Sequence, residues 1–484
     1  MKKYRRIAVW MHRAMRLSDN AALWQAAREA DEVIPVLFLG ASPSFRLDSP
    51  RRLFIRGSIR ALNEDLSRIG SFLTVVPGDP LRDFPGWVNT HHVEAVYTAR
   101  IHDPGSAARD EALGAKLASC NCPIHFFNDS LLFDKGELLT QGGEPYRVYT
   151  PFCQHTSTKL AGSTPPYPRV ASLRTPALPG FLSIDRFPDF ARYDPTAGEK
   201  NALHRLRRFI RKSLDSYAGA RDTPGIDGTS RLSSYLSIGS LGIRTVLQSV
   251  LEALREPDGR RPFRHDFFVR ELLWREFFGH VLAHYPEVVD RPFREKFANL
   301  DWSENRKHWS RWCEGRTGYP IVDAGMRQLR QEGWIHNRVR MVVASFLTKD
   351  LHVNWQDGEK YFFERLIDAD VASNNGGWQW VAGSGADAAP YFRIFNPVRQ
   401  SERFDSEGTY IRKYLPELAR VPRNFIHEPW KMSITEQDEA GARIGKDYPS
   451  PIVHHAEERE VALALFNRRR RAGHPISRNR TDLR

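Results

Sequence analysis

Two short segments in the second half of the chain combine aromatic or sulfur-containing side chains with amide, carboxylate and guanidinium groups. In "ELLWREFF", Glu271, Trp274 and Arg275 lie three and four positions apart, so one helix would carry them on a single face. The segment "WIHNRVRM", residues 334–341, repeats this arrangement with an amide, a guanidinium and a methionine. Buried polar groups need hydrogen-bonding partners, which a plain apolar core does not supply. We therefore expect both faces to line the site of a polar aromatic ligand.

A third segment, residues 374–397, reads "NNGGWQWVAGSGADAAPYFRIFNP" and places two amides and two glycines directly before two tryptophans. Gly376 and Gly377 would let the backbone pass close to a ligand. Nine of the twelve tryptophans lie between Trp274 and Trp430. Core packing accounts for any single one of them, but less well for so many rings beside polar or charged residues. An aromatic pocket lined by amides is the expected result.

A hydroxyl-rich loop supplies groups that suit phosphate. In "IDGTSRLSSYLSIGSLG", residues 226–242, Thr229, Ser230 and Ser233 offer hydroxyls and backbone N–H groups near an expected helix start. An ordinary side-chain cap of that helix would use the same residues. At this point both interpretations stay open.

The helices and strands that must position these groups are predicted from two different sequence patterns in the two halves of the chain. Up to about residue 130, short apolar runs alternate with amphipathic segments, which predicts a Rossmann-like α/β domain over residues 1–134 with a doubly wound parallel sheet. No G-x-G-x-x-G follows the first strand, so a dinucleotide need not bind there. Strands are expected over 6–12, 32–40, 71–79, 94–100 and 123–129, and helices over 20–30, 49–70 and 106–119.

The rest of the chain reads differently. Residues 135–200 are rich in Pro, Gly and Ser and predict a connector between domains. Residues 201–466 carry apolar side chains at helical spacing and predict an all-α domain. The segment 467–484, rich in arginine, predicts a basic C-terminal tail.

The charge and cysteine content of the chain limit the kinds of partner and metal site to expect. Lys plus Arg exceeds Asp plus Glu by 71 − 58 = 13, and this positive charge favours a polyanion such as nucleic acid. The four cysteines are scattered without zinc-ligand spacing, so we predict reduced structural thiols and no metal. Neither a membrane span nor a secretory leader is expected, which predicts a cytoplasmic protein, and we expect a monomer.

The separated blocks "GTSRLSSYLSIG", "ELLWREFF", "GRTGYPIVDAGMRQLRQEGWIHNRVRM", "VASFLTKDL" and "DADVASNNGGWQWVAGSGADAAPYFRIFNP" resemble the photolyase/cryptochrome flavoproteins. Their order and spacing match through the second domain, and the looser match of the first half extends the resemblance to nearly the whole chain. Among the family's members, the chain is most similar to class I cyclobutane pyrimidine dimer photolyases. The resemblance implies an antenna-type α/β domain, a connector, and a helical domain that binds FAD.

It also implies a set of cofactor contacts. Asp368 and Asp370 would hold the flavin and ribose side, Arg340 would pair with Asp368, and Asn374 would face the redox-active flavin nitrogen. The implied contacts on the phosphate side are Tyr217, Thr229, Ser230, Arg231, Leu232 and Ser233, with Arg275 nearby.

Three tryptophans align with the family's electron relay. Trp378 would lie next to the flavin, Trp355 in the middle and Trp302 at the surface. Electron hopping falls steeply with distance, so closely spaced rings serve such a relay. Trp309 and Trp312 are interpreted as structural.

The implied reaction is light-driven electron transfer from reduced FAD to a pyrimidine dimer flipped out of DNA. For binding, Trp274 and Trp380 would clamp the dimer, Asn337 would hydrogen-bond to it and Met341 would line its cavity. Glu271 would hydrogen-bond to the dimer and count, with Asn374, among the catalytic residues. The remaining implied contact is between the DNA backbone and Arg221.

Several departures from the family pattern matter. Enzymes for the six-four photoproduct tend to carry His-His where this chain has His336-Asn337, which argues against that specificity. In the first half, Ala14 stands where an acid is common, and the folate-binding acid is missing from "YTARIHDPGS". The type of antenna chromophore, and whether there is one, stay open.

Two other functions compete with repair. A cryptochrome-type blue-light receptor would keep the flavin and the tryptophans, but such receptors often alter the dimer cavity, replace the residue at Asn374 and add a long extension. Here the cavity residues and Asn374 are present and the tail is short, which favours repair. A basic helical DNA-binding module without cofactor would yield a colourless protein.

Overall fold

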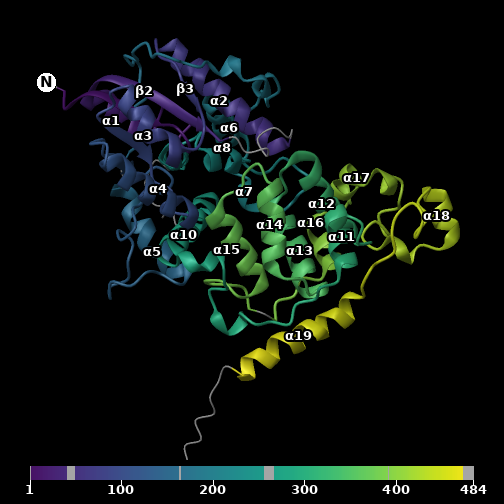
Figure 1. The fold of residues 1–484 in the computed structure, drawn as a ribbon. Helices are drawn as coiled ribbons and strands as arrows, with labels where there is room; N and C mark the ends of the chain where they lie inside the picture. Colours follow the sequence, from purple (N-terminus) through teal and green to yellow (C-terminus); the bar gives the residue numbers. More distant parts are fainter. Residues whose placement is uncertain (1, 41–48, 163–164, 255–265, 391, 473–484) are drawn as a thin grey trace, which may run out of the picture. The chain divides into compact units, whose positions relative to one another are not determined.

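The computed structural model describes residues 2–40, 49–162, 165–254, 266–390 and 392–472 (Figure 1). The chain forms two compact units. Unit 1 comprises Met1–Arg221, Gly228–Pro286 and Arg365–Ser373, and unit 2 comprises Asp222–Asp227, Glu287–Glu364 and Asn374–Arg484. Each unit is thus assembled from segments that are far apart in the sequence.

A five-stranded parallel sheet organises the first part of unit 1. Its order is β3-β2-β1-β4-β5, so the chain turns back beside β1 and winds in the opposite direction through β4 and β5. This arrangement confirms the predicted doubly wound sheet. The strands are β1 (Tyr4–Trp10), β2 (Ala30–Leu39), β3 (Thr74–Pro77), β4 (Ala95–Ala99) and β5 (Ile124–Phe127).

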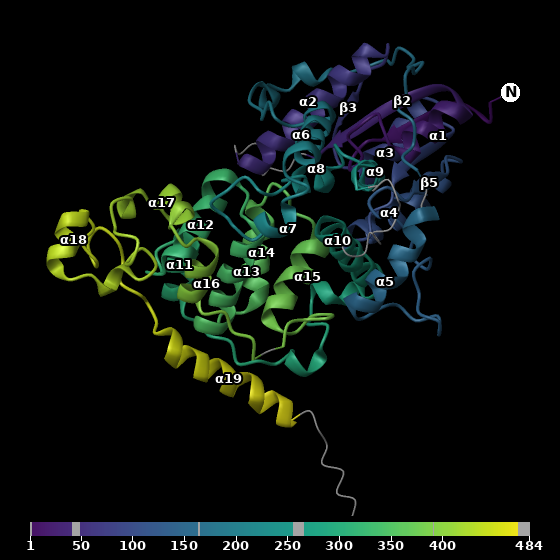
Figure 2. The same ribbon diagram turned by 180° about the vertical axis from the view of Figure 1, so that it is seen from behind.

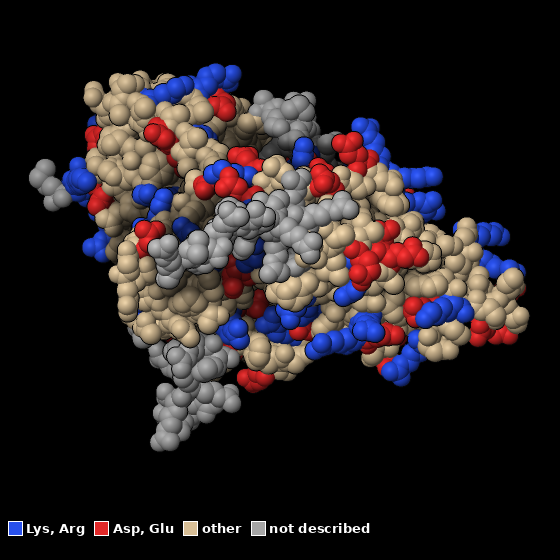
Figure 3. All heavy atoms as spheres, turned by 90° about the horizontal axis from the view of Figure 1, so that it is seen from below, with Lys and Arg blue, Asp and Glu red and all other residues tan. Residues whose placement is uncertain are grey.

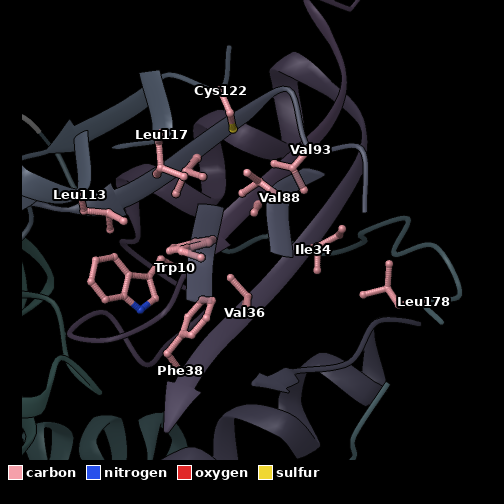
Figure 4. Close-up of a cluster of buried hydrophobic side chains, with 13 residues drawn as sticks. Trp10, Ile34, Val36, Phe38, Val88, Val93, Leu113, Leu117, Cys122 and Leu178 are labelled. Carbon is pink, nitrogen blue, oxygen red and sulfur yellow. The ribbon is translucent and has the colours of Figure 1, made fainter. Parts of the chain in front are cut away.

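Helices cover both faces of this sheet. Alternate residues such as Trp10, Ile34 and Val36 point from the strands into one buried cluster, where they meet Val88 of α3 and Leu113 of α4 (Figure 4). Helix α1 packs against the central strands β1, β2 and β4. Burial on both faces explains why the strands read as continuous apolar runs. The helices are α1 (Ala21–Glu29), α2 (Pro50–Arg68), α3 (Pro80–Thr90) and α4 (Pro104–Ala118).

Two helices were not anticipated. Helix α3 contains Pro85, which ordinarily argues against a helix. The Asp79 side chain caps its first turn by accepting hydrogen bonds from the backbone N–H groups of Leu81 and Arg82. Helix α5 (Tyr149–Lys159) lies within the segment predicted as connector. Capping outweighs the effect of Pro85 in α3, whereas α5 has no side-chain cap and is stabilised by packing against α10.

The described residues beyond β5 contain helices and isolated bridges but no further strand, which confirms the mostly helical second half (Figures 1 and 2). Helix α19 extends past residue 467, into the predicted tail, and residues 473–484 lie outside the described part. The helices of this half that bear on function are α7 (Tyr217–Ala220), α8 (Ser233–Ile238), α10 (Phe267–His284), α11 (Arg306–Glu314), α13 (Asn337–Ser345), α14 (Trp355–Arg365), α15 (Val371–Ala382) and α19 (His455–Ala472). The others are α6 (Glu199–Lys212), α9 (Ile243–Ala253), α12 (Pro320–Glu332), α16 (Pro397–Phe404), α17 (Thr409–Tyr414) and α18 (Ile434–Ala440).

All four cysteines are free thiols, as predicted. Burial raises the pKa of the Cys122 thiol to about 12, so it stays protonated and acts as a core residue. Among the described helices, none has the length and apolar character that crossing a bilayer requires. On the face shown in Figure 3, basic and acidic side chains are interspersed, so the positive surplus does not form one block there.

Candidate active site

The hydroxyl-rich loop leads into α8 without a side-chain cap. The N-cap residue of α8 is Leu232, whose side chain makes no capping hydrogen bond, and the Ser230 hydroxyl accepts a long hydrogen bond of 3.4 Å from the Leu232 backbone N–H. The interpretation of Thr229, Ser230 and Ser233 as ordinary capping residues is therefore wrong. Uncapped N–H groups at a helix start, with hydroxyls beside them, can bind a phosphate.

Neighbouring residues hold this loop in place. The Arg205 side chain donates a hydrogen bond from Nε to the Ser230 carbonyl oxygen at 2.7 Å. A Cβ on Gly228 would lie 2.7 Å from the Cβ of Ala220, so the loop passes closely over α7. Arg231 has a φ of 50°, in the left-handed region that non-glycine residues rarely adopt. Tyr217, the first residue of α7, is buried in the same unit.

A cavity of about 60 Å³ in unit 1 brings together two more of the predicted cofactor residues, Arg275 from α10 and Asp370. The Arg275 guanidinium donates to the Ser130 carbonyl oxygen at 2.7 Å. The Asp370 carboxylate accepts from the backbone N–H of Ser373 at 2.9 Å and so caps α15. Asp368, two residues earlier, is buried.

The amides at the start of α15 have separate tasks. Asn374 donates from Nδ2 to the backbone oxygen of Glu359 at 2.9 Å. Its side-chain oxygen lies on the other side of the amide group and can act as a hydrogen-bond acceptor. Asn375 and Gln379 are buried, and both donate to the Val288 carbonyl oxygen, at 3.0 and 2.9 Å. These two amides are structural, whereas the half-buried Asn374 can serve a ligand.

Burial raises the pKa of the Glu359 carboxyl to about 7, although a hydrogen bond from Asn375 opposes the shift. Gly377, two residues further along α15, has open space where a Cβ would stand. A helix normally favours Ala over Gly at such a position. In unit 1, the uncapped start of α8 offers N–H groups that suit phosphates. In unit 2, the Asn374 oxygen and the space beside Gly377 suit a polar ring, and FAD contains both kinds of group.

The predicted relay tryptophans all lie in unit 2. Trp378 and Trp355 are buried, and Trp302 is half-buried at a surface groove. Gly358 lies one helical turn after Trp355 on α14, and a Cβ there would be 2.3 Å from the Trp378 ring. Helix α14 therefore packs directly against Trp378. The electron-transfer roles of these three residues stay a prediction.

Two pairs of side chains in unit 1 include residues that were predicted to bind the dimer or DNA. The Trp274 ring stacks on the ring of Tyr149, with centroids 3.7 Å apart and planes at 7°. Arg221 and Glu271, both predicted to contact DNA or dimer, form an ion pair at 2.8 Å. Tyr149 was missed because it belongs to α5, 125 positions from Trp274 in sequence (274 − 149), and no local pattern marks such a contact.

The remaining substrate residues lie in unit 2. Asn337 is exposed at the first turn of α13, and Met341 is half-buried one turn later. Trp380 is half-buried although Trp378 is buried, as expected for helix positions two apart. Arg340 donates from Nε to the Ile335 carbonyl oxygen at 2.9 Å, and its pairing with Asp368 stays a prediction.

Two family models match the chain. Residues 7–171 match "DNA photolyase", and residues 268–468 match "FAD binding domain of DNA photolyase". The deoxyribodipyrimidine photo-lyase of Agrobacterium fabrum is 39% identical over 469 residues, covering 95% of this chain and 97% of that protein. The enzyme of the same name from Escherichia coli K12 is 36% identical over 483 residues, covering 96% and 98%.

Solved structures of photolyases and a cryptochrome also resemble this chain over nearly its full length. A bacterial class III photolyase from Agrobacterium tumefaciens superposes with a TM-score of 0.87 at 38% identity, covering 97% of this chain and 99% of that one. A Synechocystis cryptochrome gives a TM-score of 0.87 at 29% identity, covering 96% and 100%. An archaeal photolyase from Sulfolobus tokodaii with two FAD molecules gives 0.82 at 30% identity, covering 96% and 100%. By its sequence over nearly its full length and by its fold, the chain belongs to the photolyase/cryptochrome family.

Proposed function

We propose that this protein is a deoxyribodipyrimidine photo-lyase, which uses blue light to open cyclobutane pyrimidine dimers in DNA. The observation that carries the proposal is the stacking of Tyr149 on one face of the Trp274 ring, which makes Trp274 a rigid aromatic platform. A base flipped out of a duplex needs such a flat apolar surface, held rigid by its neighbours. Glu271 lies one turn before Trp274 on the same helix and supplies a hydrogen-bonding group beside the platform.

FAD, when bound, supplies the light-absorbing ring and the electron for the dimer. The uncapped start of α8 and the hydroxyls of Thr229, Ser230 and Ser233 bind the phosphates. The backbone groups of Arg231 and Leu232 belong to the same loop, and Tyr217 and Arg275 complete this side. The support for this assignment is the chemistry of the donor set, which offers N–H and O–H groups to an anion.

The ring end of the cofactor meets carboxylates and an amide. Asp368 and Asp370 orient the flavin and ribose, with Arg340 as the counter-charge of Asp368. The side-chain oxygen of Asn374 would accept a hydrogen bond from a protonated ring nitrogen, since its NH₂ group already donates to the Glu359 backbone oxygen. Trp378, Trp355 and Trp302 would form the relay that carries electrons from the surface towards the bound cofactor.

DNA binding combines charge with stacking. Trp274 and Trp380 stack on the two bases of the dimer, Met341 packs against it, and Asn337 and Glu271 hydrogen-bond to it. Arg221 contacts a phosphate, and the net charge of +13 strengthens association with the polyanion.

A monomer in the cytoplasm, where it would meet its DNA substrate, belongs to the same proposal. The archaeal photolyase from Sulfolobus tokodaii holds two FAD molecules, which imply a novel light-harvesting cofactor in that protein.

The second candidate is a cryptochrome-type light receptor, favoured by the equal TM-score of 0.87 for the Synechocystis cryptochrome. One assay separates the two: chemically reduced protein is mixed with an oligonucleotide carrying one thymine dimer, and dimer loss is followed in blue light and in darkness. Loss only in light, weakened by Trp380→Ala and by Glu271→Ala, supports repair. A yellow protein that photoreduces but leaves the dimer intact would favour the receptor.

A further inference from the structure

The outer face of helix α6 in unit 1 carries only basic side chains. Within this helix, every residue of which the structure describes, the single acid Glu199 is buried. Its carboxylate accepts hydrogen bonds from the backbone N–H groups of Leu17 and Ser18, at 2.8 and 3.1 Å. The exposed side chains share one face of the helix and form what we call the basic stripe: Lys200, His204, Arg207, Arg208, Arg211 and Lys212.

The basic stripe works against the stability of the helix that carries it. Arg207 and Arg211 lie four positions apart, and like charges at this spacing repel each other and destabilise a helix. Packing of the buried residues Ala202, Leu206 and Phe209 on the opposite face holds α6 in place. A bound polyanion would remove the repulsion and release counterions, so concentrated positive charge favours such a partner.

Three aromatic rings place α6 beside the predicted DNA contact, Arg221. Phe209 of α6 packs against Tyr217 of α7 and Phe268 of α10, with centroids 5.6 and 4.6 Å apart. Tyr217 and Phe268 also contact each other, at 5.3 Å. Arg221 is the C-cap residue of α7, and its ion pair with Glu271 reaches α10. The C-terminal half of α6 is therefore packed against the two helices that carry proposed DNA contacts.

The first turn of α10 adds another guanidinium to this surface. The ring of Phe267 is 43% exposed, and the guanidinium carbons of Arg221 and Arg270 lie 5.7 and 6.0 Å from its centroid. Arg270 is itself exposed. Positive side chains thus occur on both sides of the ring cluster that joins α6 to α10.

We propose that the basic stripe of α6 binds the phosphates of the duplex that flanks the dimer, outside the set of residues proposed to hold the dimer itself. The inference rests on the proposed function. Lys200 and Lys212 are twelve positions apart (212 − 200). This spacing covers about 18 Å along a helix, or roughly five base steps of DNA on one side of the lesion. Because these side chains contact phosphates and not base edges, the contact is independent of sequence.

The length of the DNA is the variable that tests this contact. The flavin-loaded full-length protein is titrated in the dark with a short single strand that ends close to the dimer, and with duplexes extended on its 5′ side, its 3′ side or both. We expect the affinity of the wild type to rise when one of the two sides is extended. Arg207→Gln/Arg211→Gln should lose most of that rise, and its salt slope on the extended duplex should fall by about two. A double variant that keeps both the rise and the slope would overturn the proposal.

Two controls separate this contact from misfolding and from a general effect of charge. Because the double variant loses like-charge repulsion, its melting temperature should equal or exceed that of the wild type. Arg28→Gln/Lys116→Gln removes two exposed charges from α1 and α4 of the same unit and should leave the rise and the slope unchanged.

Repair of the short strand in light distinguishes failure of the contact from failure of the proposed function. Wild type and Arg207→Gln/Arg211→Gln should repair this strand equally well after chemical reduction, because it does not reach the basic stripe. An equal loss of affinity for the short strand and the extended duplexes would place the two arginines at the dimer and contradict the flanking contact. A wild type that repairs no dimer of any length would instead refute the proposed function.

Discussion

The indole of Trp274 lies parallel to the phenol ring of Tyr149, with centroids 3.7 Å apart and planes at 7°. The Tyr149 hydroxyl donates to the Arg270 carbonyl oxygen at 2.8 Å, which fixes the phenol against α10. One face of Trp274 is therefore occupied by the protein itself. A stacked base can use only the opposite face, and Tyr149 acts as a positioning residue for that platform.

Replacing Tyr149 by Leu should weaken binding of dimer-containing DNA without removing the flavin. Aromatic pairs contribute about 0.5–1.5 kcal/mol beyond area burial, so we expect affinity to fall roughly two- to tenfold. Fluorescence anisotropy with a dimer-bearing oligonucleotide measures the effect. Tyr149→Phe keeps the stack and should bind nearly as well as the wild type. Equal losses in both variants would assign the effect to the hydroxyl instead.

The ion pair between Arg221 and Glu271 predicts a change in selectivity. In Glu271→Gln, the Arg221 guanidinium has lost its carboxylate partner. It can therefore bind a DNA phosphate without first breaking an ion pair. Half-exposed ion pairs contribute about 0.2–1 kcal/mol, so affinity for undamaged DNA should rise by up to roughly fivefold while dimer preference falls. Titrations at several salt concentrations check this.

As the complementary variant, Arg221→Ala should weaken binding to damaged and undamaged DNA alike. The loss of one phosphate contact should also reduce the salt slope by about one. An unchanged slope would remove Arg221 from the DNA contact.

Gly377 and Gly358 give opposite predictions. Gly377→Ala should stabilise the flavin-free protein by up to about 1 kcal/mol, because alanine favours a helix and the added Cβ meets open space. If the cofactor fills that space, flavin occupancy should fall. Gly358→Ala should instead lower the melting temperature, because its Cβ would clash with Trp378. Flavin absorbance per protein and thermal unfolding measure both, and full occupancy in Gly377→Ala would exclude the cofactor from this space.

The Glu359 carboxyl predicts a pH dependence of stability. Its pKa is raised from an ordinary 4.5 to about 7 in the fold, so the folded state prefers the protonated form. The stabilisation is complete below pH 4.5 and is lost as the pH rises through 7, by at most roughly 3 kcal/mol. Glu359→Gln should flatten this part of the curve in urea unfolding. The exposed Glu364 on the same helix gives Glu364→Gln as the control, which should leave the curve unchanged.

The layers of the fold and most of its helices and strands follow from the sequence alone. Alternation of short apolar runs with amphipathic segments is a local property, and it predicted the parallel sheet and the helical half. The connector helix α5 was missed because the packing of Tyr149 on Trp274 is not visible in local composition. Helix α3 was missed because of its internal Pro85, although Asp79 before Pro80 is a local helix-start signal.

Motif order likewise identified the family and proposed its cofactor and substrate residues. The folded structure is needed to see which polar groups already have hydrogen-bonding partners within the protein. Asn375 and Gln379 bind the Val288 carbonyl, whereas Asn374 keeps an acceptor for a ligand, although all three have the same amide chemistry. Trp312 and Trp309 read as core residues in sequence, and their stacking toward Trp378 depends on how α11 packs beside α15. Spacing along the chain reports which residues share one helix face, while contacts between helices arise from packing of the whole unit.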